Sequence, residues 1–168
     1  KLQYRYVAAA GDKWMGNTFT AGQVYWIDLM TSLTSVNFNF DTFWNTTESK
    51  DEILFVNGSS NIYQWSGGVT TMASATVNTV TKTGTKSWAE EGFFQALAGR
   101  SITINGVTAT YTGGEGTTTL TGVSVDFSAI AANTIVQQTV TTSANSTITG
   151  LPTTFKNALI ANLKNQIY

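Results

Sequence analysis

Residues 51–65, DEILFVNGSSNIYQW, contain the pattern that decides the fold. An apolar run leads to an Asn-Gly pair at Asn57, and a second short run with Ile, Tyr and Trp follows. Two such runs around a tight turn predict a β-hairpin. Residues 157–168, NALIANLKNQIY, repeat the outline of this hairpin and end partway through it.

A short signature recurs along the chain, in which a polar residue and a β-branched residue precede Tyr25, Tyr63 and Tyr168. Tyr25 and Tyr63 are 38 residues apart, which is close to the roughly 40–50 residues of one propeller blade. Tyr168 follows Tyr63 by 105 residues, and this longer spacing predicts an insertion between the two copies. Because residues 159–162 align with residues 54–57 without a gap, a strand is preferred there over a short helix.

The composition favours strands over helices. Only 11% of the 168 residues are charged, against about a quarter in an average globular protein. Thr, Ser, Asn and Gly must therefore supply most of the polar surface, and β-branched side chains pack well on a pleated sheet. We predict an all-β fold: a partial β-propeller-like scaffold of antiparallel strands with an inserted small β subdomain.

Three segments follow from these patterns. Residues 1–71 are predicted to form the propeller-like scaffold, residues 72–150 the inserted β subdomain, and residues 151–168 a return to the scaffold that continues in a longer polypeptide. Within the insertion, SITINGVTATYTGG places Asn105-Gly106 between two alternating runs, which predicts a hairpin. The stretch SWAEEGFFQALAG, residues 87–99, is interpreted as a helical or irregular crossover.

Several function classes are excluded by what the sequence lacks. Without His or Cys there is no Ser-His-Asp or Cys-His nucleophilic site and no disulfide framework, and we predict no cofactor and no metal site. The net charge is −1 and the nine basic residues are scattered, so no specific nucleic-acid binding is expected. No apolar run approaches the roughly 20 residues that cross a bilayer, so no membrane insertion is expected.

Glu90 and Glu91 are the one conspicuous acidic pair beside aromatic residues. Paired carboxylates can cleave glycosides, but adjacent residues of a strand point to opposite faces. Solvated loop carboxylates are therefore the preferred interpretation, and no catalytic residue is predicted.

Four segments resemble virion structural proteins of tailed bacteriophages, in the group with irregular β-propellers interrupted by small β insertions. The segments are DEILFVNGSSNIYQWSGGVTT, TKTGTKSWAEEGFF, SITINGVTATYTGGEGTTTLTGVSVD and NSTITGLPTTFKNALIANLKNQIY. The resemblance rests on turn and strand motifs in the right order rather than on a catalytic signature. Chains of this group continue past the equivalent of NQIY, so the missing strands are expected from further sequence or from neighbouring subunits.

The resemblance implies a non-enzymatic structural protein of a phage tail, such as a nozzle, hub or connector-type ring, that acts in particle assembly. Its partners would be copies of itself in a ring and neighbouring virion proteins. The insertion would contact the next subunit or ring through Trp88, Phe93, Phe94 and Leu97, although each of these residues could equally pack the core of the insertion.

A second function class remains open at this point. Exposed aromatic residues can stack on sugars or anchor protein interfaces. A receptor-binding or carbohydrate-binding module would use Trp26, Trp44 or Trp65 for stacking, and would have a measurable sugar affinity.

Overall fold

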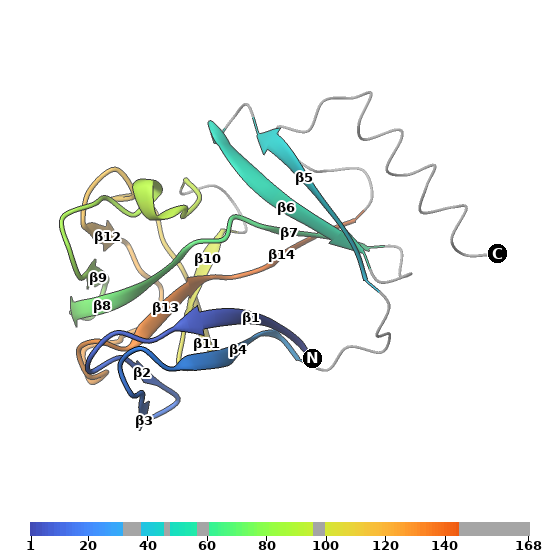
Figure 1. Cartoon of the computed structure of the whole chain (residues 1–168). Helices are drawn as coiled ribbons and strands as arrows, with labels where there is room; N and C mark the ends of the chain where they lie inside the picture. Colours follow the sequence, from blue (N-terminus) through green and yellow to red (C-terminus); the bar gives the residue numbers. More distant parts are fainter. Residues whose placement is uncertain (32–37, 46–47, 57–60, 96–99, 145–168) are drawn as a thin grey trace.

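The computed structural model of the chain describes residues 1–31, 38–45, 48–56, 61–95 and 100–144. These residues form an all-β fold, in which helix is limited to one short 3-10 turn within the described ranges (Figure 1). The elements are β1 (Leu2–Val7), β2 (Lys13–Trp14), β3 (Asn17–Thr18), β4 (Val24–Met30), β5 (Asn39–Asn45), β6 (Lys50–Val56), β7 (Asn61–Trp65), β8 (Val69–Ala75), β9 (Thr79–Lys82), η1 (Ala89–Glu91), β10 (Ser101–Ile104), β11 (Val107–Thr110), β12 (Thr119–Thr121), β13 (Ile135–Gln138) and β14 (Thr141–Ala144).

Two sheets make up most of the molecule. The four-stranded sheet, here called the blade sheet, has the order β5-β6-β7-β14 with antiparallel pairing throughout. The six-stranded sheet, here called the inserted sheet, has the order β11-β10-β13-β8-β9-β12, and residues 69–138 supply all of its strands. The inserted sheet thus enters between the third and fourth strands of the blade sheet. This arrangement confirms the predicted all-β, partial propeller-like scaffold with an inserted β subdomain.

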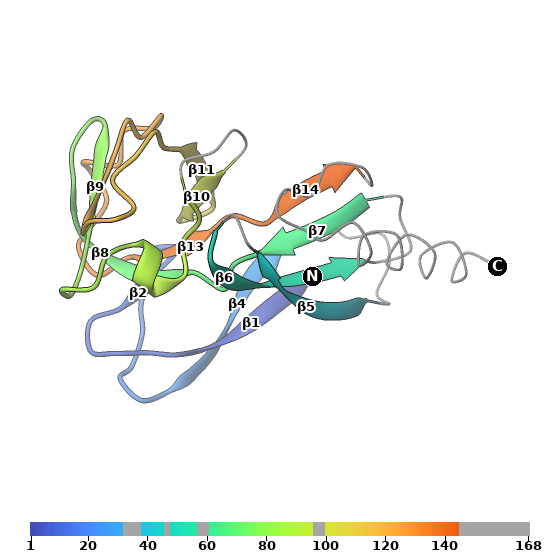
Figure 2. The same cartoon turned by 90° about the horizontal axis from the view of Figure 1, so that it is seen from above.

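One long antiparallel ladder passes through both sheets. β7 runs into β8 and β13 runs into β14, so that β7 pairs with β14 in one sheet and β8 with β13 in the other. The ladder bends at Ser66–Gly68, where Gly67 has a positive φ of 76° and Gln138 N donates to Gly68 O at 2.8 Å. In both views the blade strands lie on one side of this bend and the strands of the inserted sheet on the other (Figures 1 and 2).

The local turn chemistry explains the hairpins. Asn105 and Gly106 both have positive φ, 49° and 79°, as a type I′ turn requires, and Ile104 pairs with Val107 on either side of them. The predicted β10–β11 hairpin is therefore confirmed. The other predicted hairpin is β6–β7, in which Phe55 pairs with Tyr63, while its turn residues 57–60 lie outside the described residues.

A core of aromatic and aliphatic side chains fills the inserted sheet. Trp88 and Phe93 are fully buried and meet edge-to-face with their ring centroids 4.7 Å apart. Each side chain of this kind contributes about 1.5–3 kcal/mol by burial. Gly68 is required beside them, because a Cβ on it would lie 3.0 Å from the Phe93 ring. The other buried members of this core are Met72, Val80, Ile102, Ile104, Ala109, Tyr111, Leu120, Val123, Phe127 and Val136.

The N-terminal hairpin β1–β4 packs on one face of the blade sheet. The aromatic cluster of that face contains Phe55, Tyr63 and Trp65, and Tyr4 from β1 lies 5.5 Å from Trp65 between ring centroids. Tyr25 belongs to β4, which pairs with β1. It therefore lies in the β1–β4 hairpin rather than at the position equivalent to Tyr63 in the blade sheet. Tyr168, and the predicted return to the scaffold at residues 151–168, lie outside the described residues.

Candidate functional site

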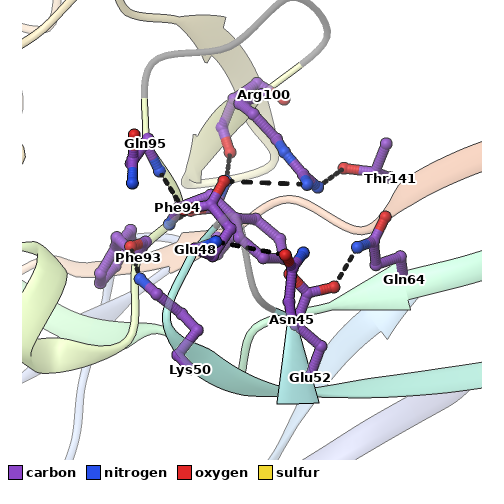
Figure 3. A network of polar contacts seen from close by, with 12 residues as sticks. Asn45, Glu48, Lys50, Glu52, Gln64, Phe93, Phe94, Gln95, Arg100 and Thr141 are labelled. Carbon is purple, nitrogen blue, oxygen red and sulfur yellow. Dashed lines mark hydrogen bonds and ion pairs between the residues drawn. The ribbon is translucent and has the colours of Figure 1, made fainter. Parts of the chain in front are cut away.

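A buried polar network joins the blade sheet to the loop that follows η1 (Figure 3). Glu48 lies in the segment before β6, Glu52 lies near the start of β6, and Arg100 is the residue before β10. All three residues are at most 5% exposed. Ionised groups are expensive to bury unless they are paired and hydrogen-bonded, so the contacts of each group decide what this network can do.

Arg100 is held from three directions. Its guanidinium group lies over the Phe94 ring, 3.6 Å from the centroid, and Nη1 donates to Thr141 Oγ1 at 3.2 Å. Nη2 faces Glu48 Oε1 at 4.0 Å, and Glu48 Oε2 accepts from the backbone N–H of Gln95 at 2.9 Å. Burial lowers the pKa of Arg100, and the charges of the nearby glutamates oppose that effect. The contacts therefore tie the loop to β14 and to the segment before β6.

Glu52 lies deeper, on the face of β6 shared with Leu54. Its Oε1 accepts from Asn45 Nδ2 at 2.6 Å and its Oε2 accepts from Gln64 Nε2, so both oxygens are occupied by neighbouring strands of the blade sheet. Burial raises the pKa of Glu52, and the two hydrogen bonds oppose the shift. Lys50 Nζ donates to the Phe93 carbonyl nearby, and burial lowers the pKa of Lys50.

The backbone of Phe94 is bound by a second group of side chains. Its N–H donates to Gln138 Oε1 at 2.8 Å, and its carbonyl accepts from the Tyr111 hydroxyl at 2.6 Å. Gln138 Nε2 in turn donates to Ser101 O at 2.5 Å, and Trp65 Nε1 donates to Gln138 O at 3.0 Å. Gln138 thus connects the loop to β10 and to the blade sheet at the bend of the ladder.

The chemistry of this network is that of a structural junction. Each carboxylate contacts donors or a cation fixed by packing, and the loop backbone is held by buried amide and hydroxyl groups. Buried networks in which most groups are paired rigidify a fold and favour one arrangement of its parts. We infer that the inserted sheet is held in one orientation relative to the blade sheet.

The carboxylates of Glu90 and Glu91 lie outside this network and each contacts a neighbouring group. Glu90 Oε2 accepts from the backbone N–H and hydroxyl of Ser87, at 2.7 and 2.8 Å, and Glu90 N lies 3.3 Å from Ser87 Oγ, which is the geometry of a capping box. These bonds lower the pKa of Glu90, whereas a glycosidase acid needs a raised one. Glu91 pairs with the buried Lys82 at 3.6 Å.

The structure separates the aromatic residues that the sequence singled out. Trp88, Phe93 and Phe94 are 0% exposed and belong to the interior, so they pack the insertion and its junction and do not reach a neighbouring subunit. Leu97 lies outside the described residues. Of the three tryptophans considered for ligand stacking, Trp65 is also buried at 8% exposure, whereas Trp26 and Trp44 are 63% and 54% exposed.

Two surfaces carry the exposed aromatic residues. On β5, at the edge of the blade sheet, Phe40 and Trp44 lie on the same face and are both more than half exposed. On the outer face of the β1–β4 hairpin, Trp26 stands beside Val24 and opposite Arg5, with Val7 next to Arg5 on the partner strand. Exposed apolar side chains that cluster in this way mark contact sites more often than isolated ones do.

The sequence did not predict the roles of Glu48, Glu52, Arg100 and Gln138. Charged and amide side chains in or beside strands ordinarily face solvent, and nothing local to these residues distinguishes them. One signal was available in β6, since Glu52 shares a strand face with the buried Leu54.

The chain matches no protein-family model, and comparisons with curated proteins and with solved structures find no match. Within the described ranges, no group of three His, Cys, Asp or Glu side chains gathers where a metal ion could be held. No helix in that part of the chain is long and apolar enough to cross a membrane.

Proposed function

We propose that this chain is a non-enzymatic structural subunit of a bacteriophage tail, where copies of it assemble into a ring together with neighbouring virion proteins. The segments that resemble tail proteins support the virion assignment, and the architecture supports the assembly role. The observation that carries the assembly role is the edge of the blade sheet at β5, where two aromatic side chains are exposed and no described strand pairs.

The edge at β5 is suited to a protein partner. β5 pairs with β6 on one side, and no described strand pairs with it on the other. In the middle of the strand, a neighbouring side chain rather than another strand binds one backbone group: the N–H of Thr42 donates to Asp41 Oδ1 at 2.8 Å. An edge strand of seven residues with two exposed aromatic side chains is a template for pairing with another chain, which monomeric proteins normally avoid.

The buried junction supports the same role from inside the molecule. A ring needs subunits whose parts keep a fixed orientation, because heterologous contacts close only at a defined rotation. The network around Arg100 and Gln138 provides such a fixed orientation between the blade sheet and the inserted sheet.

The test is the mass of the natural protein without denaturant, measured for the wild type and for two matched lysine variants. Trp44→Lys places a charge on the β5 edge, and Val77→Lys places one on another exposed apolar side chain, 67% exposed, in the turn between β8 and β9. We expect a multimeric wild type, a Trp44→Lys variant whose assembly is weakened at least about tenfold, and an unaffected Val77→Lys variant.

A wild type that remains monomeric at micromolar concentration would overturn the proposal. A multimer that Trp44→Lys leaves unchanged would instead remove β5 from the interface and direct attention to the Trp26 surface.

A further inference from the structure

A cavity of about 300 Å³ lies between the N-terminal hairpins and the inserted sheet. It is open to solvent and is lined by the turn between β2 and β3, the end of β4, the β10–β11 hairpin and the segment from β13 to β14. Its volume is at the lower end of the range for small-molecule pockets, which is about 300–1,000 Å³. Its lining consists of Trp14, Met15, Asp28, Leu29, Met30, Thr31, Thr103, Gly106, Thr108, Gln137 and Thr139.

The lining combines one aromatic residue with a row of hydroxyl groups. Trp14, Leu29 and the two methionines supply apolar surface. Among the hydroxyl groups, Thr103 Oγ1 lies 2.7 Å from Thr139 Oγ1 and 3.3 Å from Thr108 Oγ1. Each hydroxyl can donate one hydrogen bond and accept two, so these three groups retain capacity for further bonds.

The charge at the cavity is already compensated. The carboxylate of Asp28 accepts from Lys1 Nζ and from Gln3 Nε2, each at 2.8 Å. A cationic ligand would compete with Lys1, whereas a neutral ligand leaves this pair intact. The remaining polar groups of the lining are neutral hydroxyl and amide groups.

The aromatic wall is held in place by the inserted sheet. Met15 N donates to Asn105 Oδ1 at 2.9 Å, and Lys13 N donates to Asn133 O at 2.8 Å. Met15 and Gly16 have positive φ, 51° and 80°, as the tight turn after Trp14 requires. The two walls are therefore preorganised relative to each other, which lowers the entropy lost on binding.

We propose that this cavity binds a single neutral sugar ring, with Trp14 against the apolar face of the ring and the Thr103, Thr108 and Thr139 hydroxyls bonding to its hydroxyl groups. A pyranose combines these two kinds of surface, with an apolar face of C–H groups and a rim of hydroxyls. The site uses none of the tryptophans that the sequence analysis considered for stacking. It is also independent of ring assembly.

The test is a titration of the natural protein with the methyl glycosides of glucose, galactose, mannose and N-acetylglucosamine, followed by saturation-transfer NMR and tryptophan fluorescence. We expect saturable binding of at least one glycoside with a dissociation constant on the order of 1–10 mM. Trp14→Ala should weaken it at least about tenfold, and Trp26→Ala, at an exposed tryptophan outside the cavity, should leave it unchanged.

Thr108→Val tests the hydroxyl row separately, because Thr108 is exposed and its replacement should not disturb folding; it should weaken binding about three- to tenfold. Absence of saturable binding for all four glycosides would overturn the inference, as would binding that persists unchanged in both cavity variants. A multimeric protein that binds no glycoside would leave the proposed function standing while removing this one.

Discussion

Arg100→Met is the substitution that tests the buried junction most severely. Methionine replaces much of the apolar stem of Arg100 but removes its charge, its stacking over Phe94 and its hydrogen bond to Thr141. The side chain of Glu48 is 0% exposed, and its Oε1 accepts no hydrogen bond from the described residues and faces Arg100 at 4.0 Å.

The magnitude follows from this geometry. Two unit charges 4.0 Å apart attract by about 4 kcal/mol at an effective dielectric constant of about 20. Removing one partner of a buried pair typically costs about 3–5 kcal/mol, because the other charge is left uncompensated. We therefore expect Arg100→Met to lower the free energy of unfolding by about 3–5 kcal/mol, measured by urea denaturation with tryptophan fluorescence.

The control is the double variant Glu48→Gln, Arg100→Met. Glutamine keeps an oxygen that can accept from the Gln95 N–H, but it leaves no buried charge behind. The double variant should lose only about 1–2 kcal/mol, which is less than Arg100→Met loses alone. A loss below about 1 kcal/mol for Arg100→Met, or a double variant at least as unstable as Arg100→Met alone, would refute the reasoning.

Three further predictions concern the junction and the inserted sheet. Burial raises the pKa of Glu52, so the folded state binds a proton more readily than the unfolded state. The wild type should therefore gain stability relative to Glu52→Gln as the pH falls from 7 toward 4.5, the ordinary pKa of a glutamate side chain. Denaturation curves with the reverse trend would contradict this. Tyr111→Phe removes the donor to the buried Phe94 carbonyl and should cost about 1–3 kcal/mol in the same urea assay, and a neutral effect would show that the carbonyl finds another donor. Gly114→Ala should lower the free energy of unfolding by at least about 2 kcal/mol, because φ is 93° and the new Cβ would lie 2.1 Å from Thr119 O. Gly116→Ala is the matched control. A Cβ there would have no atom within 4 Å, so this substitution should change thermal stability little.

Local patterns in the sequence predicted the elements whose causes are local. The hairpin at Asn105 forms as expected, because the turn needs two adjacent residues with positive φ and Asn-Gly supplies them. The insertion was predicted because Tyr168 follows Tyr63 by more than the spacing of Tyr25 and Tyr63, yet the structure places Tyr25 and Tyr63 in two different sheets. The copy of the repeat at Tyr25 is therefore not a strand of the blade sheet.

Long-range contacts decide the rest. Glu48 and Arg100 are far apart in the sequence, and nothing near either one shows that they meet in the interior. The aromatic residues were assigned by density, and density does not distinguish a core from a surface. Trp88, Phe93 and Phe94 consequently lie in the core instead of at a subunit contact, while the cavity beside Trp14 depends on three hairpins that meet only in the folded chain.

Electron microscopy of the natural protein, purified without denaturant, tests the central claim most directly. The proposed function predicts class averages of a closed ring, with the β5 edge of each blade sheet at the contact with the next subunit. Isolated single subunits at the same concentration, or rings whose contacts lie away from β5 and the Trp26 surface, would contradict it.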